Sequence, residues 1–523
     1  MLVIQKIILH NFKRFDHLEL DVNPGLNIFV GDNESGKSTL LLAIDLVARG
    51  SFARVQEIGL ERLFNIQAVK SFLNSTKSIT QLPEMYVELY FNEQDDINLY
   101  GATNSKNIST SGIRMRCAFN DQYGEIVNSL YLADSKAPFP FEFYTVSFET
   151  FSGVPYVAYS KKLHSLFIDN SQVGSPVAMR DYVSAIYQST LSEQDRFLVN
   201  FEYRKHKQQF ENKFFAEYNQ AIAPRSFVVR KGPKDNLETD ISIVDNEILL
   251  ENKGTGSQCF IKTLLSLQRK IDGIDVVLIE EPENHLSYMK TMELIRLIQC
   301  TQNRQLFIST HSDLIATRLD LRNCRLLNSA STKIVSLNSL SEETAKFFVK
   351  SPDNNMLQFI LSDKSILVEG DAEYILMEAM SKQTLRKDLI EAGIGVISVD
   401  GKCFKRYLEI AKILNNKVAV ITDNDGNYQE SIENTYSEYT SNQYPNIRIF
   451  SDKDSERYTF EVCIYKDNQA ICDETFSSSR RQLPIVDYML HNKTEAAYLL
   501  MCNKANEIAT PIYIQEALQW IDD

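Results

Sequence analysis

The sequence lacks the long apolar runs, paired cysteines and secretory start that are typical of membrane and secreted proteins. No window among the 523 residues supplies about 18 consecutive apolar residues, so we expect no transmembrane helix and no membrane partner. Residues 1–15 alternate like a strand and contain no long hydrophobic region with a cleavage site. None of the eight cysteines forms a C-x-x-C pair or has a histidine at zinc-finger spacing. These absences predict a cytoplasmic protein with reduced cysteines.

An excess of basic residues is also missing. The formal net charge is −14, which argues against a protein coated in nucleic acid but leaves room for a local basic groove. The chain has no internal repeat and no low-complexity tract. Its length predicts roughly two to four domains. A hydrophobic fraction of 44% is enough to build several cores.

A strand, a glycine loop and a helix open the chain in the order that a P-loop requires. Residues 31–39 read GDNESGKST, which fits G-x-x-x-x-G-K-[ST]. Their backbone N–H groups and the helix that follows, over 37–50, should bind the phosphates of ATP. We expect Lys37 to reach the β- and γ-phosphates and Ser38 to ligate Mg²⁺. The residues assigned to nucleotide binding in this loop are Gly31, Asn33, Gly36, Lys37, Ser38 and Thr39.

Two further apolar strands end in polar residues, as strands of a parallel sheet do at its carboxyl edge. Residues 276–279 lead into Glu280 and Glu281, which has Walker B form. We expect Glu280 to hold the hydration shell of Mg²⁺ and Glu281 to polarise the attacking water. The strand 306–309 leads into His311, at the position of a histidine that senses the γ-phosphate. A Glu-Glu-Pro turn or a lone histidine is by itself usually structural, so the prediction depends on their occurrence together.

Between these strands and the P-loop lies a segment that resembles the signature motif of ABC-type ATPases. It reads Thr-Gly-Ser-Gln, where the usual motif is Ser-Gly-Gly-Gln, and its residues are Thr255, Gly256, Ser257 and Gln258. In ABC ATPases this motif completes the nucleotide site of the other protomer. The resemblance therefore implies a homodimer or a higher homo-oligomer with shared ATP sites.

A second set of acidic residues follows two apolar strands near the C-terminus. The strand 366–368 is followed by Glu369, with Glu373 one helical turn further on, and the strand 418–422 is followed by Asp423 and Asp425. Carboxylates gathered at one sheet edge favour Mg²⁺ or Mn²⁺. Two such ions would activate both oxygens of a phosphodiester displacement. The alternative is a pair of acidic turns that cap helices.

With this acidic pattern, the whole chain resembles the OLD (overcoming lysogenisation defect) family of nucleases, a group that includes the Gabija nuclease subunit and retron-associated effectors. The resemblance implies an ABC-type ATPase head followed by a Toprim domain. It implies an ATP-gated, metal-dependent DNA endonuclease in antiphage defence, with a second defence protein or a retron nucleic acid as a further partner. It also adds Glu461 as a metal ligand and Lys493 as the cation on the scissile phosphate.

The expected site residues fall into two groups. The residues expected to be catalytic are Glu281, His311, Glu369, Asp423, Asp425 and Lys493. The residues expected to ligate metal are Ser38, Glu280, Glu369, Glu373, Asp423, Asp425 and Glu461.

The expected fold is α/β: a P-loop ATPase head with a helical insertion, then a Toprim domain with a Rossmann-like parallel sheet. The predicted parts are residues 1–160 and 223–350 for the ATPase, 161–222 for the insertion and 351–523 for Toprim. Strands are expected at 226–230, 239–244 and 247–250. For the insertion, a dimerisation arm, a partner surface and a plain helical subdomain all stay open.

Two other functions stay open from the residues alone. One is a nucleotide-driven sensor or scaffold whose Toprim domain binds nucleic acid or a partner without cutting. The other is a topoisomerase or primase, which fits less well because the first needs a dedicated tyrosine nucleophile and the second lacks an ABC-type head. Lys402, Lys405 and Arg406 are either contacts to DNA phosphates or a solvated basic face.

Overall fold

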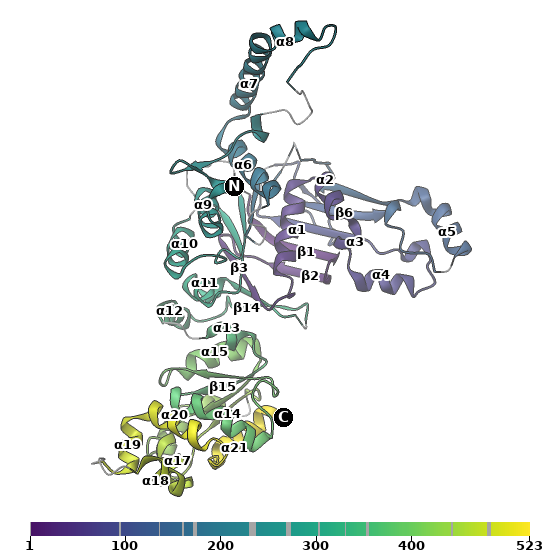
Figure 1. Ribbon diagram of the computed structural model, residues 1–523. Helices are drawn as coiled ribbons and strands as arrows, with labels where there is room; N and C mark the ends of the chain where they lie inside the picture. Colours follow the sequence, from purple (N-terminus) through teal and green to yellow (C-terminus); the bar gives the residue numbers. More distant parts are fainter. Residues whose placement is uncertain are drawn as a thin grey trace. The chain divides into compact units, whose positions relative to one another are not determined.

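The computed structural model describes residues 2–93, 96–134, 136–158, 160, 162–170, 175–229, 237–267, 274–301, 304–329, 331–351, 355–440, 443–477 and 483–523. It separates into two compact units (Figure 1). The first comprises Met1–His311 with Asn323–Ile334, and the second comprises Ser312–Arg322 with Val335–Asp523. Among the described helices, none combines the length and apolar character needed to cross a membrane. The domain boundaries at 160, 222 and 350 stay predictions.

The first unit contains an antiparallel sheet in the order β2-β1-β4-β6-β5, with β7 also paired to β6. The strand β1 lies between β2 and β4, so that its alternate residues face a core. The strands of this sheet are β1 (Ile4–Phe12), β2 (Phe15–Asp21), β4 (Met85–Phe91), β5 (Tyr100–Gly101), β6 (Thr110–Phe119) and β7 (Tyr144–Thr150).

A second sheet of the same unit has the order β14-β13-β3-β12-β11-β8. The pairs from β13 to β8 are parallel, which is the α/β arrangement expected for the P-loop unit. Its carboxyl edge gathers the ends of β3, β12, β11 and β8. The strands are β3 (Leu26–Gly31), β8 (Ser165–Asp169), β11 (Val276–Glu280), β12 (Gln305–Thr310), β13 (Cys324–Leu327) and β14 (Ile334–Ser336).

The helix α1 (Lys37–Arg49) contacts strands of both sheets and lies in their shared core (Figure 1). Its buried residues recur at three and four positions, and Gly50 ends it in the left-handed conformation with φ 56°. The helix predicted over 37–50 is thus confirmed. The helix that begins at the P-loop therefore packs against both sheets of the unit.

Residues 161–250 depart from the expected strands and helices. The segment predicted to be helical from residue 161 first supplies β8, and its helices begin only at Pro176. The strand predicted at 226–230 is wrong within the described residues 226–229, and of 239–244 only Val244 lies in a strand. The strand predicted at 247–250 is confirmed only for Ile248–Leu249. The described residues form a short hairpin of two strands with two residues each, and its turn consists of Asn246 and Glu247, both with positive φ. The elements here are α6 (Pro176–Thr190), α7 (Glu193–Phe214), α8 (Ala216–Ala221), β9 (Val244–Asp245) and β10 (Ile248–Leu249).

The other helices of the first unit cover its sheets. In chain order they are α2 (Phe52–Ile58), α3 (Leu60–Leu63), α4 (Ile66–Leu73), α5 (Gly124–Ala133), α9 (Thr255–Leu267) and α10 (Tyr288–Cys300).

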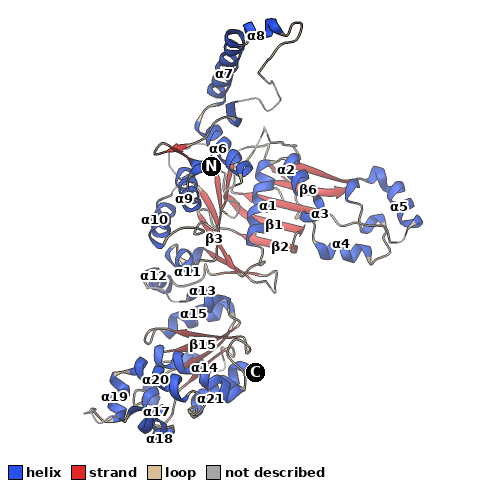
Figure 2. Ribbon diagram, in the orientation of Figure 1, coloured by secondary structure: helices blue, strands red, loops and turns tan. Residues whose placement is uncertain are grey.

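The second unit is built on a parallel sheet in the order β16-β15-β17-β18, with helices on both sides (Figure 2). The strands β15 and β17, predicted from their apolar runs, are central and fully paired. The strands are β15 (Lys364–Val368), β16 (Ile394–Ser398), β17 (Lys417–Ile421) and β18 (Ile447–Phe450).

The helices α14 and α21 contact this sheet and share one apolar cluster with Ile366 and Val368. The helices of the unit are α11 (Asp313–Arg318), α12 (Glu342–Lys350), α13 (Met356–Leu361), α14 (Asp371–Leu385), α15 (Phe404–Leu414), α16 (Ser437–Thr440), α17 (Phe460–Asp467), α18 (Gln469–Phe476), α19 (Ile485–His491), α20 (Lys493–Lys504) and α21 (Ile512–Asp522).

One buried side chain joins the two sheets of the first unit. Gln305, the first residue of β12, is fully buried. Its Oε1 accepts a hydrogen bond from Ile4 N at 2.8 Å, and its Nε2 donates to Ile4 O and Asn23 O, both at 2.7 Å. The side chain therefore satisfies three backbone groups that would otherwise be buried without partners.

Replacing this residue should weaken the first unit more than an ordinary glutamine substitution would. Gln305→Leu leaves three backbone groups unpaired, so we expect the free energy of unfolding to fall by about 3 kcal/mol. The corresponding thermal transition should drop by about 5–10 °C. Scanning fluorimetry checks this against Gln67→Leu, which changes an exposed glutamine on α4. Equal transitions in the two variants would contradict the role given to Gln305.

Candidate functional site

The P-loop connects β3 to α1 in a geometry that only glycine allows at Gly36. This residue has φ +102°, and a Cβ there would lie 2.7 Å from the Phe15 ring and 2.8 Å from Arg14 Cδ. At Gly31 a Cβ would lie 2.1 Å from the carbonyl oxygen of Leu327 on β13. Asn33 is exposed in the loop, and Thr39 is half-buried in the first turn of α1.

The side chain of Lys37 lies over the loop and is almost completely buried. Its Nζ donates hydrogen bonds to the carbonyl oxygens of Gly31 and Asp32, both at 2.8 Å. Burial lowers the pKa of Lys37 to about 8, although the carboxylates of Glu281 and Asp32 act in the opposite direction. The ammonium is thus positioned beside the loop, where it can exchange backbone oxygens for phosphate oxygens.

Glu280, the last residue of β11, hydrogen-bonds Ser38 across the site. Burial raises the pKa of Glu280 above its ordinary value, and the hydrogen bond from Ser38 offsets only part of this rise. Because the structure brings a hydroxyl from α1 and a carboxylate from β11 together, both oxygens can serve one Mg²⁺ ion.

Glu281 turns the chain away from β11 with a positive φ of 45°. Its carboxylate accepts a hydrogen bond from Asn284 Nδ2 at 2.5 Å and lies 3.4 Å from His311 Nε2. Burial and the charge of Lys37 lower the pKa of His311, so the imidazole is neutral at physiological pH. The structure brings both predicted residues to the carboxyl edge of the parallel sheet.

Glu283 was missed by sequence reasoning and positions this pair. Its Oε1 accepts hydrogen bonds from Thr310 Oγ1 at 2.5 Å and from His311 N at 2.9 Å. Burial raises its pKa. The repeated acids of Glu-Glu-Pro-Glu were a signal in the sequence, but only the pairing of β11 with β12 places the third acid under His311.

Asn170 was also missed. It follows β8, the strand whose Asp169 pairs in register with Glu280 of β11. Asn170 is 1% exposed, its Nδ2 donates to Glu281 O at 3.4 Å, and its Oδ1 accepts no hydrogen bond among the described residues. No pattern in the sequence indicated that β8 belongs to this sheet.

The signature-like segment begins α9 but does not present all four residues to solvent. Thr255 and Ser257 are exposed, whereas Gln258 is buried and donates hydrogen bonds to Lys253 O at 2.7 Å and Glu251 O at 3.1 Å. A Cβ on Gly256 would lie 2.2 Å from His285 O. Within one chain, Gln258 and Gly256 therefore fold the segment, and Thr255 and Ser257 are available to a ligand.

In the second unit, β15 and β17 place Glu369 and Asp423 side by side at the carboxyl edge of their sheet. Glu369 Oε1 accepts hydrogen bonds from Thr422 Oγ1 at 2.5 Å and from Asp423 N at 3.1 Å. Asp423 Oδ1 accepts one from Phe460 N, at the start of α17, at 2.8 Å. These bonds orient both carboxylates without neutralising them.

Glu373 and Glu461 complete a set of four acidic side chains here. Burial, with the nearby charges of Glu369, Glu373 and Glu461, raises the pKa of Asp423 to about 8. Burial and the charges of Glu461 and Glu369 raise the pKa of Glu373 to about 7. Because each carboxylate makes the others harder to ionise, the set favours a bound cation.

Lys493, the first residue of α20, is the basic side chain that faces these acids. Its Nζ lies 3.1 Å from Glu461 Oε2. Burial alone would lower the pKa of Lys493, but the charge and hydrogen bond of Glu461 raise it overall. Two residues assigned only by family resemblance are thus neighbours in the structure.

Asp425 takes a different position from the other acids. It has a positive φ of 50° and forms an ion pair with Lys402. Whether Asp425 ligates metal stays a prediction.

The donor set fits hard divalent cations, since every donor is a carboxylate oxygen and the like charges repel. As the side chains stand across the described residues, no three carboxylate, imidazole or thiol groups converge as tightly as a bound metal requires. Metal binding would therefore require these carboxylate side chains to rotate toward one another at the edge of the sheet.

Comparisons with known proteins assign each half of the chain. A profile for the AAA ATPase domain matches residues 3–232 and 227–316. A profile for the overcoming lysogenization defect protein-like TOPRIM domain matches residues 360–425. The DNA replication and repair protein RecF of Stenotrophomonas maltophilia is 45% identical over 47 residues, which are 9% of this chain and 13% of that protein. The chain thus matches only about an eighth of the length of this relative.

Two solved structures align with parts of this chain at low similarity. The SMC head domain from Thermotoga maritima aligns with 64% of this chain and 99% of its own, at 15% identity and a TM-score of 0.31. The C-terminal region of the Xanthomonas campestris pv. campestris OLD protein aligns with 31% of this chain and 95% of its own, at 21% identity and a TM-score of 0.24. Because the AAA ATPase profile matches more than half of the chain, the chain belongs to the AAA ATPase domain family, and it carries an OLD-like TOPRIM domain at residues 360–425.

Proposed function

We propose that this protein is a DNA endonuclease that depends on Mg²⁺ or Mn²⁺ and is gated by ATP. The observation that carries the proposal is the set of four carboxylates facing Lys493 at the carboxyl edge of the Toprim sheet. Such a set has too much negative charge to be stable alone and is complementary to cations and a phosphodiester together.

In this proposal Glu369, Asp423, Glu373 and Glu461 would hold the divalent ions, and Asp425 would be a further ligand. The bound ions would supply Lewis-acid stabilisation and a water of lowered pKa. Lys493 donates to a non-bridging oxygen of the scissile phosphate. Its ion pair with Glu461 keeps the ammonium within reach of that oxygen before the substrate arrives.

In the ATPase half, Lys37 binds the β- and γ-phosphates, while Ser38 and Glu280 hold the Mg²⁺ that accompanies them. Glu281 orients the attacking water, and the neutral imidazole of His311 donates to the γ-phosphate. Thr255 and Ser257, which are exposed, would contact ATP bound to a second copy of the chain. We therefore propose a homodimer or higher homo-oligomer.

DNA as the substrate is consistent with the RecF relative, which is a DNA replication and repair protein by name. A role in antiphage defence, with a second defence protein or a retron nucleic acid as partner, rests on the family alone.

The Toprim assignment predicts that Asp423→Asn cleaves DNA at least about 100-fold more slowly, because the substitution removes a metal ligand from the centre of the set. Nicking of supercoiled plasmid with Mg²⁺, Mn²⁺ or Ca²⁺, with and without ATP, measures this. The matched control is Asp363→Asn, an exposed residue just before β15, at the opposite end of the strand from Glu369.

Wild-type rates in Asp423→Asn would overturn the site. Absence of cleavage by the wild type with every ion, combined with an ATP-dependent change of shape, would instead favour a sensor or scaffold.

The same carboxylate should make stability depend on pH. In the folded protein the pKa of Asp423 is about 8, above its ordinary value of 3.8, so the folded state binds this proton more tightly than the unfolded state. In EDTA, stability should therefore fall as pH rises from about 4 to 8. Asp423→Asn should unfold about 2–6 °C higher than wild type at pH 8 and nearly equally at pH 4.

Scanning fluorimetry over pH, repeated with Mn²⁺, checks this expectation. Added Mn²⁺ should raise the wild-type transition and leave that of the variant nearly unchanged. An identical pH dependence in both proteins would show that Asp423 does not carry the buried charge.

The ATPase assignment predicts that Glu281→Gln keeps nucleotide affinity but hydrolyses ATP at least about 100-fold more slowly, because the water loses its base. Lys37→Ala should weaken nucleotide binding itself. Phosphate release and binding of a fluorescent ATP analogue separate the two effects. Glu293→Gln, on the exposed face of α10, is the control. Unchanged turnover in Glu281→Gln would rule out Glu281 as the base.

A further inference from the structure

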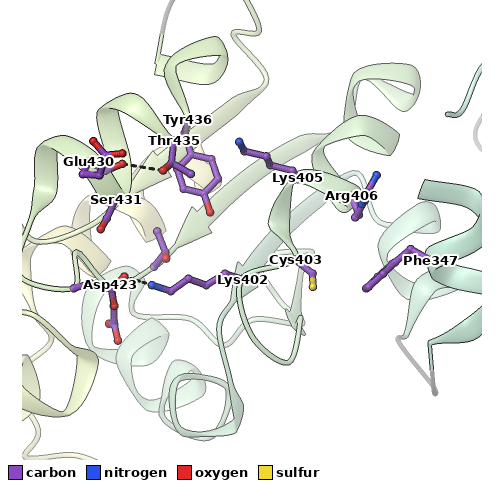
Figure 3. Close-up of a pocket in the computed structure, with 12 residues that line it drawn as sticks. Phe347, Lys402, Cys403, Lys405, Arg406, Asp423, Glu430, Ser431, Thr435 and Tyr436 are labelled. Atoms are coloured by element: carbon purple, nitrogen blue, oxygen red, sulfur yellow. Dashed lines mark hydrogen bonds and ion pairs between the residues drawn. The ribbon is translucent and has the colours of Figure 1, made fainter. Parts of the chain in front are cut away.

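A cavity of about 460 Å³ is lined by Asp423 and Asp425 but not by Glu369, Glu373 or Glu461 (Figure 3). Its walls come from the loop before α15, the first turn of α15 and residues 430–436. The volume lies in the usual range for a small-molecule site, about 300–1,000 Å³, and is larger than a single ion requires. The cavity is lined by Phe347, Lys402, Cys403, Lys405, Arg406, Thr422, Asp423, Asp425, Glu430, Ser431, Thr435 and Tyr436.

The basic side chains of this cavity differ in whether they are already paired. Lys402 forms an ion pair with Asp425. Arg406 donates to Thr344 Oγ1 at 3.0 Å and lies 3.3 Å from Glu343. The Nζ of Lys405 makes no ion pair or hydrogen bond with the described residues and lies 5.9 Å from the centre of the Tyr436 ring. Lys405 is therefore the cation of this cavity without an ion pair or hydrogen bond to the described residues, although the charge of Glu438 acts on it.

Tyr436 supplies a donor beside it. The residue is only 4% exposed, yet its hydroxyl has no hydrogen-bond partner among the described residues. Figure 3 shows this hydroxyl directed into the space between Lys402 and Lys405. Burial raises the pKa of Tyr436 to about 12, so the phenol keeps its proton and donates. Because Tyr436 lines the cavity, its hydroxyl can donate a hydrogen bond to an anionic ligand there.

The charges of the cavity restrict what that ligand can be. Asp423, Asp425 and Glu430 would repel a free anion, while Lys405 and Tyr436 attract an anion at the part of the wall that they line. A polyanion whose first phosphate lies with the metal ions and whose next phosphate lies at Lys405 satisfies both ends. Phe347 and Cys403 provide an apolar end suited to a sugar.

We propose that Lys405 and Tyr436 form a subsite for the phosphodiester that flanks the scissile bond of the nucleic-acid strand, an inference that rests on the nuclease function proposed above. The subsite would fix the register of the strand relative to the acidic edge. Lys405 and Tyr436 would thus be positioning residues, and Lys493 the residue at the scissile phosphate.

The test compares Lys405→Ala and Tyr436→Phe with Lys382→Ala, which removes an exposed lysine on α14. Affinity for a short fluorescein-labelled single-stranded DNA is measured by anisotropy over a range of salt concentrations, in an Asp423→Asn background that prevents cleavage. Lys405→Ala should weaken binding about 10-fold and reduce the slope of log affinity against log salt by about 0.7. Tyr436→Phe should weaken binding about 3- to 10-fold with the slope unchanged, because no charge is lost.

Cleavage in the otherwise wild-type protein gives the second readout. Both substitutions should raise KM and leave kcat nearly unchanged, while Lys382→Ala changes neither. If the enzyme cleaves DNA and both variants bind and cleave like Lys382→Ala, the subsite is wrong although the nuclease function stands. If the wild type cleaves DNA with none of the metal ions tested, the nuclease function fails and the proposed register fails with it.

Discussion

Buried negative charge at the carboxyl edge of a parallel sheet is the constraint on which both halves of this protein depend. Parallel strands end at one edge, so acidic residues that follow them are brought together whatever their separation along the chain. In the first unit the edge carries Glu280, Glu281 and Glu283, and in the second it carries Glu369, Asp423 and Glu461. Such edges are stable only beside cations, and in both units a lysine from a helix N-terminus supplies one.

The two lysines serve this purpose differently. Lys37 is buried and hydrogen-bonded to P-loop carbonyl oxygens, so burial lowers its pKa. Lys493 is half-exposed and paired with Glu461, so the carboxylate raises its pKa. Each ammonium is held by groups weaker than a phosphate, which allows a phosphate ligand to replace them without moving the backbone.

Backbone geometry strengthens the parallel between the two sites. Glu281 and Asp425 both follow a strand and both have positive φ, a conformation that non-glycine residues seldom adopt. In each case the acid with positive φ lies one or two residues after the first acid of its edge, Glu280 or Asp423. The first acid thus stays with its sheet edge while the second meets a different partner, His311 or Lys402. The two acids of each edge therefore have different partners and can serve different roles.

The sequence by itself determined the local units. The glycine pattern of residues 31–39, the apolar helix after it, and the strands that end at Glu280, Glu369 and Asp423 follow from short-range spacing. Only the tertiary structure decided which distant residues meet: β8 joining the ATPase sheet, Glu283 holding His311, Gln258 turning inward, and Glu461 facing Lys493 from another helix. The reason is physical: spacing along a chain constrains the dihedral angles of neighbours, whereas contacts between segments depend on which buried surfaces pack together.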